Sequence, residues 1–370
     1  MTKATFVASK LVFEDEEDPE YPPEFNGYDY DDSEDEFEDG DPAEKRPLYR
    51  FNAEENIWAR HIVDSTITPH ANPKLFAIAT WNVDFSKNFL APRLTTCLDH
   101  LQSHIEPLLA EDPPIPTIIL IQELDCNIFE TLLKHPFIQK HYDLTNISPA
   151  AWRHSYGSVT LVPSSMQVTS AFRSIFTTSR MGRDALYIDI SFPADDTDDV
   201  QGNPVKVVRV ANVHLESLDG HGDIERPRQL AIVASHLNET GVYGGIVGGD
   251  MNPIGPRDAA VPAELGFTDG WTACHSQQLG SESASTGNAP ENTRASKVDR
   301  GNEESHTWGY QPRGRFPPCR MDKVLSIGNV KVRTIERIGV GLKVDPSLVQ
   351  GQGWIWASDH YGLLAKVEVV

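Results

Sequence analysis

The sequence contains few cysteines, no long apolar run and, over one stretch, no positive charge. No apolar segment of the 370 residues approaches the ~20 residues that a membrane helix needs. The first 20 residues lack the layout of a secretory signal. The four cysteines form no CxxC pair and match no zinc spacing; they are Cys97, Cys126, Cys274 and Cys319. We therefore expect a protein without a membrane partner, in the nucleus or the cytoplasm, where cysteines stay reduced.

Positive charge is missing from residues 14–44, which hold 17 of the 54 acidic residues and no Lys or Arg. The net charge is -22, yet the acidic residues elsewhere nearly balance the 32 bases. A segment with so much charge and so few apolar residues cannot offset the entropy of ordering. We predict a mostly disordered acidic tail over 1–50. It is either a solvated segment without a specific role or one that binds a protein partner or inhibits the site.

From Lys74 onward, short apolar runs predict an ordered domain in which strands outnumber helices. Leu94, Leu98, Leu101 and Ile105 recur at helical spacing and predict a helix over 89–111. Further helices are predicted over 127–141 and 224–240, and a mobile loop over 276–305, where Ser, Asn and Gly dominate. Strands are predicted over 75–83, 117–124, 157–162, 184–192, 205–215, 244–250 and two stretches near the C-terminus. This pattern indicates two packed sheets with helices outside.

Polar residues follow these strands one after another. A single such residue is typical of a solvated strand end, a turn or a satisfied core histidine, so each carries little weight alone. Their joint occurrence predicts one site where all six clusters meet. The clusters are TWNVD (Asn82, Asp84), IQE (Gln122, Glu123), NVHLES (Asn212, His214, Glu216, Ser217), GGDMN (Asp250, Asn252), RMDK (Asp322) and SDH (Asp359, His360).

In this order, the clusters resemble the endonuclease/exonuclease/phosphatase superfamily of metal-dependent phosphoesterases, over residues 75–370. Within it the motifs are most similar to those of the tyrosyl-DNA phosphodiesterases, because GHGDIERPRQL follows HLES and a Thr307-Trp308 pair precedes RMDK. The resemblance implies an α/β (α+β) four-layer sandwich. Its two mixed, mostly antiparallel β-sheets pack face to face with helices outside, and 51–370 form one catalytic domain.

The resemblance also implies a metal site. Glu123 would be the direct ligand, and Asp84 and Asp359 would support the metal through its waters. Breaking a phosphodiester requires neutralisation of its negative charge, which a hard cation bound by oxygen ligands achieves. Mg²⁺ is the expected metal and Mn²⁺ the alternative.

Three residues are expected to act on the attacking water. By resemblance, Asp250 orients and deprotonates it, while Asn82 and Asn252 hold Asp250 and a phosphate oxygen. An amide suits this role because it both donates and accepts hydrogen bonds without adding negative charge.

Two histidines are expected to bind the phosphate. His360 would stabilise the pentacovalent state, with Asp322 fixing its tautomer and favouring the imidazolium, and His214 would add a second donor. The implied reaction releases a tyrosine from a DNA 5′ end and leaves a 5′-phosphate. A phenol with a pKa of about 10 departs more easily than a sugar alcohol, which permits this substrate without requiring it.

Substrate contacts are expected from several further residues. Trp308 either stacks on a DNA base or packs within the fold, and Tyr156 matches an aromatic residue near the family's site. Ser217, Arg226 and Arg320 are candidates for the DNA backbone. DNA with a 5′-linked tyrosine or peptide is thus the expected partner of a monomeric enzyme.

Other functions remain open. The superfamily also contains abasic-site nucleases, poly(A) deadenylases and inositol-phosphate phosphatases, and an inactive binding scaffold is a third class. The tryptophan-rich motif of the inositol enzymes is replaced by RMDK, and no leucine-rich repeats precede the domain, which disfavours two of these options. The scaffold is disfavoured because all six clusters keep chemically competent residues.

Overall fold

Two large sheets form the centre of the fold. The computed structural model describes residues 43–61, 72–193, 205–279, 303–351 and 353–370. The first sheet has the strand order β1(Ala43–Lys45), β8(Val168–Ile175), β9(Asp184–Pro193), β10(Val205–His214), β11(Val242–Asp250), β13(Asp322–Gly328), β12(Thr268–Asp269). The second has the order β14(Val330–Ile338), β17(Gly362–Val369), β4(Leu75–Asn82), β5(Thr117–Asp125), β7(Tyr156–Pro163), β6(Tyr142–Leu144), β2(Leu48–Asn52), β3(Ile57–His61). Within these sheets, β10–β11 and β4–β5 pair in parallel and the other described pairs are antiparallel.

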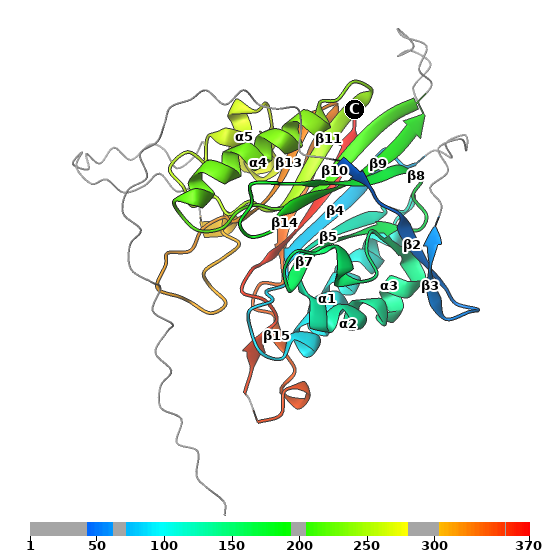
Figure 1. Ribbon diagram of the computed structural model, residues 1–370, viewed down its shortest axis with the longest axis vertical. Coiled ribbons are helices and arrows are strands. Elements are labelled where there is room, and N and C mark those ends of the chain that lie inside the picture. Colours follow the sequence, from blue (N-terminus) through cyan, green and yellow to red (C-terminus); the bar gives the residue numbers. More distant parts are fainter. Residues whose placement is uncertain (1–42, 62–71, 194–204, 280–302, 352) are drawn as a thin grey trace, which may run out of the picture. The chain divides into compact units, whose positions relative to one another are not determined.

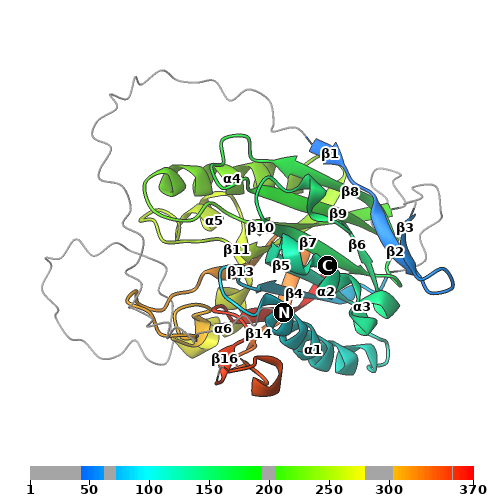
Figure 2. The ribbon, with the colours of Figure 1, turned by 60° about the horizontal axis from the view of Figure 1, so that its bottom comes forward.

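Helices cover the outer face of each sheet, which makes four layers (Figures 1 and 2). On the second sheet lie α1(Leu90–Leu109), α2(Phe129–Leu133) and α3(Pro136–His141), and on the first lie α4(His221–Leu237) and α5(Val261–Glu264). Helix α6(Gly270–Leu279) packs on β13 and β14, and β15(Lys343–Val344) pairs with β16(Ile355–Trp356) outside both sheets. The short 3₁₀ turns are η1(Cys126–Ile128), η2(Pro149–Ala151), η3(Glu303–Ser305) and η4(Pro346–Leu348). The predicted sandwich is confirmed.

Strand β4 shows why the sequence forms this layered core. Phe76 and Ile78 face the first sheet and belong to the core between the sheets. Ala77, Ala79 and Trp81 point the other way and pack against the helices. Because successive side chains of a strand alternate between its faces, a run that is apolar at every position must be covered on both sides. No helix among the described residues is both long and apolar enough to cross a membrane.

The structure corrects the predicted limits of the tail. Ala43–Lys45 form β1, and β2 begins at Leu48, so ordered structure starts before residue 51. Glu44 forms an ion pair with Arg173 of β8 at 2.6 Å, which anchors the edge strand β1. Within ten residues the chain thus contributes a strand to each sheet. Residues 1–42 lie outside the described part of the chain, so the predicted disorder there stays a prediction.

Two other predicted segments are shorter than expected. Residues 276–279 continue α6 and Glu303–Ser305 form η3, so both ends of the predicted 276–305 loop have regular structure, while 280–302 lie outside the described residues. The single helix predicted over 127–141 is instead η1, α2 and α3, which are separate elements. Pro136 accounts for the break because proline has no N–H for a continuous helix and is favoured at a helix start.

Candidate active site

Strand register brings the polar strand ends to one edge of the sandwich. In the first sheet His214 lies opposite Asp250, and Asp250 lies opposite Asp322, across three adjacent strands. In the second sheet Asn82 ends β4, and its side-chain Nδ2 donates to Asp250 Oδ2 at 3.0 Å. Because both sheets end here, Asn82 and Asp250 are hydrogen-bonded although they lie 168 positions apart in the sequence. His360 joins them from a position two residues before β17.

Asp250 lies at the centre of the site. Its Oδ2 accepts from Asn82, and its Oδ1 accepts from the backbone N–H of Asn252 at 2.9 Å. Burial raises its pKa, while the positive charge of His360 opposes this rise. The preceding Gly249 has φ +149°, and a Cβ there would collide with the carbonyl of Val213 on the neighbouring strand. Glycine therefore allows the close strand pairing that positions Asp250 beside His214.

Glu123 projects into the site from a β-bulge. The register between β5 and β7 shifts between Ile121 and Leu124, so two residues of β5 oppose one of β7. Glu123 has φ +56°, a left-handed conformation that turns its side chain out of the strand. Burial raises its pKa to about 7 against the lowering effect of the Asn82 hydrogen bond, and Asp250 and Asp359 add to the rise. The carboxylates thus form a negatively charged cluster that a cation would stabilise.

Asp84 is neutralised within the fold. Its Oδ2 accepts from Arg93 of α1 at 2.7 Å, and its Oδ1 accepts from the Ser86 hydroxyl at 2.6 Å. Burial raises its pKa, but Arg93 and Ser86 together outweigh burial and lower it below the usual range. Asp84 is therefore ionised and already paired, which leaves it an indirect role at any metal centre.

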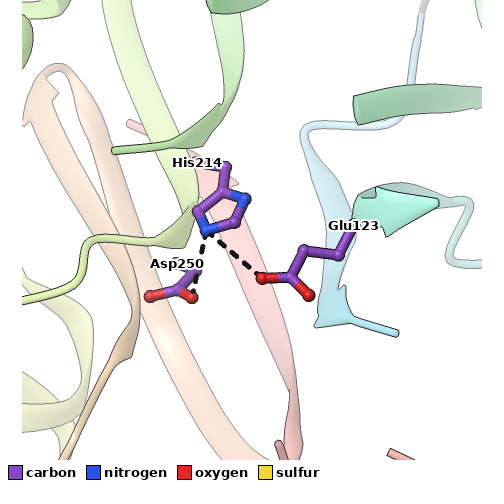
Figure 3. Close-up of side chains that lie close together, drawn as sticks. All are labelled: Glu123, His214 and Asp250. Atoms are coloured by element: carbon purple, nitrogen blue, oxygen red, sulfur yellow. Dashed lines mark ion pairs between the residues drawn. The ribbon is translucent and has the colours of Figure 1, made fainter. Parts of the chain in front are cut away.

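His214 points at two carboxylates from the end of β10 (Figure 3). Its Nε2 lies 3.6 Å from Glu123 and 3.5 Å from Asp250, and its Nδ1 contacts Arg183 Nη1 at 2.7 Å. An arginine can only donate, so Nδ1 is the acceptor and the proton of the neutral ring sits on Nε2. Burial and then Arg183 hold the pKa of His214 well below its usual range. The ring is thus a neutral donor, and its buried Nε2 has no hydrogen-bond partner.

His360 has the opposite protonation. Its Nδ1 lies 2.8 Å from Asp322, and its Nε2 lies 3.8 Å from Asp250 and 3.9 Å from Asp359. Burial lowers its pKa, but the three carboxylates, Asp322 first, raise it well above the usual range. His360 is therefore an imidazolium. The half-buried Trp308 donates from its indole to Asp359 at 3.0 Å, which fixes that carboxylate beside the histidine.

Arg183 was not singled out from the sequence. It lies in the turn before β9, where nothing in the local sequence distinguishes it from a surface arginine. The buried Glu216 holds this turn: it accepts from the Ser179 hydroxyl at 2.6 Å and from the backbone N–H of Met181 at 3.2 Å, while Gln229 also donates to it. Glu216 thus acts on the site through the loop that brings Arg183 to His214.

Backbone strain is concentrated in this region. Six non-glycine residues of the described chain have positive φ, and Asp84, Glu123 and Asn252 are three of them. Such conformations are unfavourable for residues with a Cβ and persist only where surrounding contacts enforce them. The fold therefore places three of the predicted site residues in conformations that the local sequence disfavours.

Two of the polar strand-end residues join the sheets instead of entering the site. Gln122 Nε2 donates to Asn212 Oδ1 at 2.8 Å, and Asn212 Nδ2 donates to the carbonyl of Val159 at 3.1 Å. All these groups are buried, so their hydrogen bonds satisfy polar atoms between the sheets. Their expected place in the site is therefore wrong.

The arginines expected to contact DNA are engaged elsewhere. Arg320 is buried and forms a two-pronged ion pair with Asp269, at 2.8 and 2.5 Å. Arg226 is buried and pairs with Asp223 and Asp258. Both guanidiniums thus bind carboxylates within the fold, and their contacts with a nucleic-acid backbone stay predictions.

Tyr156 and Ser217 do lie at the edge of the site. Tyr156 stacks on Phe85 with ring centroids 3.8 Å apart, and the Arg183 guanidinium lies 5.3 Å from its ring centre. The Ser217 hydroxyl accepts from Arg183 at 3.3 Å. Arg183 thus connects both residues to His214.

Among the residues that the structure describes, two groups of side chains have ligand atoms within 4.8 Å of one another: Glu123 with His214 and Asp250, and Asp250 with Asp322 and His360. Neither histidine offers a lone pair at the site, because His214 carries its proton on Nε2 and His360 is an imidazolium. The donors left for a metal are carboxylate oxygens. This chemistry fits a hard cation such as Mg²⁺ better than zinc or copper.

Comparisons with known proteins agree with this architecture. No family model and no curated protein matches the sequence. Among solved structures, TDP2 from Caenorhabditis elegans is similar with a TM-score of 0.55 and 18% identity, covering 80% of this chain and 75% of that one. Danio rerio TDP2 in complex with a single-strand DNA product gives 0.51 and 18%, covering 80% and 99%. An endonuclease/exonuclease/phosphatase protein from Bacteroides vulgatus gives 0.50 and 15%, again covering 80% and 99%. The chain therefore has the endonuclease/exonuclease/phosphatase fold.

Proposed function

We propose that the protein is a metal-dependent phosphodiesterase. One observation carries this proposal: a carboxylate, Asp250, lies between two histidines whose protonation is opposite and fixed by their partners. Hydrolysis of a phosphodiester needs a base for water and donors for the phosphate oxygens, and this arrangement supplies both. A scaffold that only bound a partner would not need such a set of buried, strained and unpaired groups.

Each residue then has a definite task. Asp250 accepts the proton of the attacking water, and Asn82 holds the carboxylate in place through Oδ2. His214 donates from Nε2 to one phosphate oxygen, because Arg183 occupies its other nitrogen. His360 donates from its protonated ring to another oxygen and stabilises the charge that accumulates in the transition state, with Asp322 holding the proton on Nδ1.

The carboxylates also fit a divalent metal. Glu123 is the proposed direct ligand, and Asp359 and Asp84 are supports through water; Arg93 already neutralises Asp84. When bound, Mg²⁺ or Mn²⁺ would neutralise phosphate charge and stabilise the leaving oxygen. The raised pKa values of Glu123 and Asp359 support this assignment, since a cation would remove the repulsion that contributes to them.

We propose a 5′-phosphotyrosyl-DNA bond as the substrate, cleaved to leave a 5′-phosphate in DNA repair. Two observations support it: the similarity in fold to TDP2 structures, and the aromatic and cationic pair of Tyr156 and Arg183 beside His214. A phenol ring could lie against such a pair, and a phenolate needs little acid assistance to leave. DNA would be the partner, in the nucleus, the cytoplasm or both, and the enzyme would act as a monomer.

A substrate panel tests this function. The full chain is assayed with Mg²⁺ against a 5′-tyrosyl oligonucleotide, an abasic duplex, poly(A) and an inositol polyphosphate, with Asp250→Asn as the matched control. Fast release of tyrosine that depends on Mg²⁺ and on Asp250 supports the proposal. Preferential cleavage of another member of the panel assigns the same site to a different phosphoester, and turnover that survives Asp250→Asn refutes the mechanism.

A further inference from the structure

A cavity of about 330 Å³ lies next to the candidate active site and has no role in the mechanism above. Its size is within the range of pockets that hold small organic groups, about 300–1,000 Å³. The lining residues come from the segment before α1, from the loop after Trp308 and from the β15–β16 segment at the bottom of Figure 1. They are Asp84, Lys87, Asn88, Phe89, Arg93, Gln311, Pro312, Trp354, Ile355 and Trp356.

The cavity is rigidly connected to the site. Asp84 lines it, and the backbone N–H of the next residue, Phe85, donates to Glu123 at 3.3 Å. Gln311 Nε2 donates to the carbonyl of Ser358, one residue before Asp359, and its Oε1 accepts from the N–H of Gly341 at 2.7 Å. The Gln311 side chain therefore ties the cavity wall to the segment that carries Asp359 and His360.

Aromatic rings dominate the exposed part of this wall. The side chain of Trp354 is 64% exposed, the largest value among the exposed large hydrophobic residues. Trp356 beside it carries the Lys343 ammonium 4.6 Å from its ring centre. In the adjoining loop Phe316 is 57% exposed, with the Arg315 guanidinium 4.7 Å from its ring. The exposed Trp354 ring, with cations over the neighbouring rings of Trp356 and Phe316, matches the stacked bases and intervening phosphates of a single nucleic-acid strand.

The local charge favours the same ligand. The one acidic residue that lines the cavity, Asp84, is neutralised by Arg93, so the exposed Lys87 leaves the wall net positive. Arg313 and Arg315 are exposed in the neighbouring loop. A chain with a net charge of -22 repels a polyanion in general, so basic groups gathered beside aromatic rings mark where a strand can approach.

We propose that this cavity is a nucleobase subsite, in which Trp354 stacks on a base of a single-stranded nucleic acid and Lys87 contacts its phosphate. The inference rests on the proposed function and deepens it: the substrate would have several unpaired nucleotides next to the scissile bond. A peptide chain linked to the reacting phosphate is the competing occupant.

Binding of 5′-phosphorylated single-stranded oligonucleotides of two, four and eight nucleotides tests the subsite. Fluorescence anisotropy is measured on the full chain in EDTA, so that hydrolysis does not interfere. Trp354→Ala should weaken binding of the eight-nucleotide strand about 5- to 150-fold, Trp354→Phe much less, and Leu348→Ala, an exposed control in the same segment, not at all. Lys87→Gln should reduce the salt-dependence slope by about 0.7.

The outcomes separate this inference from the proposed function. Hydrolysis of bis(4-nitrophenyl) phosphate, which has no nucleobase to stack on Trp354, should be unchanged in Trp354→Ala. If this small diester is not cleaved but Trp354→Ala loses oligonucleotide binding, the phosphodiesterase proposal fails and the subsite stands. Oligonucleotide binding that stays within twofold in Trp354→Ala overturns the subsite. If the loss of binding in Trp354→Ala grows with the length of a linked tyrosyl peptide and not with the length of the oligonucleotide, the cavity binds the peptide. This result also overturns the nucleobase subsite.

Discussion

Replacing Asp250 by asparagine should abolish hydrolysis while the fold stays intact. The side chains have the same shape, but an amide cannot accept a proton from water. General-base catalysis contributes about 10²–10⁴ in rate, so kcat should fall by at least about 10². The measurement is steady-state hydrolysis of bis(4-nitrophenyl) phosphate with Mg²⁺, together with urea unfolding followed by circular dichroism.

The structure also sets the expected stability. Asn252 N–H and Asn82 Nδ2 both donate to Asp250, one to each oxygen. An asparagine offers only one oxygen, and Asn82 cannot flip to compensate because its own Oδ1 accepts from the N–H of Asp84 at 3.0 Å. The new amide nitrogen at position 250 therefore faces a second donor, either Asn82 Nδ2 or the Asn252 N–H, which lowers the free energy of unfolding by about 1–3 kcal/mol. Against this, burial raises the pKa of Asp250, so removing its charge removes the cost of burying a charged group. The net change in the free energy of unfolding should be small.

Asp189 provides a matched control. It is a buried carboxylate on β9 that binds Arg209 through both oxygens, at 2.6 and 3.0 Å, and it takes no part in the site. Asp189→Asn should lose about 3 kcal/mol of stability because it breaks a buried ion pair, and should keep kcat for molecules that remain folded. Asp250→Asn is thus expected to lose kcat and keep its stability, whereas Asp189→Asn is expected to lose stability and keep its kcat. Asp250→Asn with more than about a tenth of the native kcat would refute the assignment of Asp250 as the base.

Three further changes probe the groups around Asp250. Asp322→Asn should lower the pKa of His360, because the carboxylate that raises it most is lost. If activity needs the imidazolium, the loss of kcat at alkaline pH should begin at a lower pH in the variant than in the native protein. A pH–kcat profile measures this shift. Glu123→Gln should raise the Mg²⁺ concentration for half-maximal activity by more than about tenfold, since even outer partners of metal ligands contribute about 10–100-fold. Arg183→Met should reduce kcat at every pH and bring it close to that of His214→Gln, whose loss of one oriented donor is expected to cost about 10²–10³.

These predictions have their own controls and contrary results. Arg180→Met removes an exposed arginine from the same turn as Arg183 and should leave kcat unchanged. If the alkaline fall of the pH–kcat profile lies at the same pH in Asp322→Asn as in the native protein, activity does not depend on the imidazolium form of His360. An unchanged Mg²⁺ dependence in Glu123→Gln would remove Glu123 as the ligand, and normal turnover in Arg183→Met would separate Arg183 from the function of His214.

Much of the candidate site could be predicted because residues at the ends of paired strands gather at one edge of the sheet. Asn82, His214 and Asp250 each end a buried apolar strand, and parallel pairing puts such ends on one edge of a sheet. The layered fold follows from the same runs, since strands that are apolar on both faces need covers on both sides. Register then determines which end residues meet, and Asp322 lies opposite Asp250 for this reason.

The other features of the candidate site depend on contacts between residues far apart in the sequence, which no local sequence pattern predicts. Arg183 and Arg320 look alike in the sequence, yet one contacts a histidine in the site and the other forms an ion pair with Asp269. Gln122 follows the same pattern as Glu123, but the bulge turns only Glu123 outward and leaves Gln122 between the sheets. One residue of register decides whether a side chain enters the candidate site or packs between the sheets, and that register is set by the whole sheet.

The left-handed conformations of Asp84, Glu123 and Asn252 imply a trade-off between durability and turnover. Glycine at Glu123 would relieve backbone strain of about 1 kcal/mol and would also end the crowding of carboxylates, whereas glycine at Asp84 would break the buried ion pair with Arg93. Selection for heat resistance alone would therefore act against Glu123 first. Hydrolytic ability is retained only while the remaining core is stable enough to tolerate these three unfavourable residues.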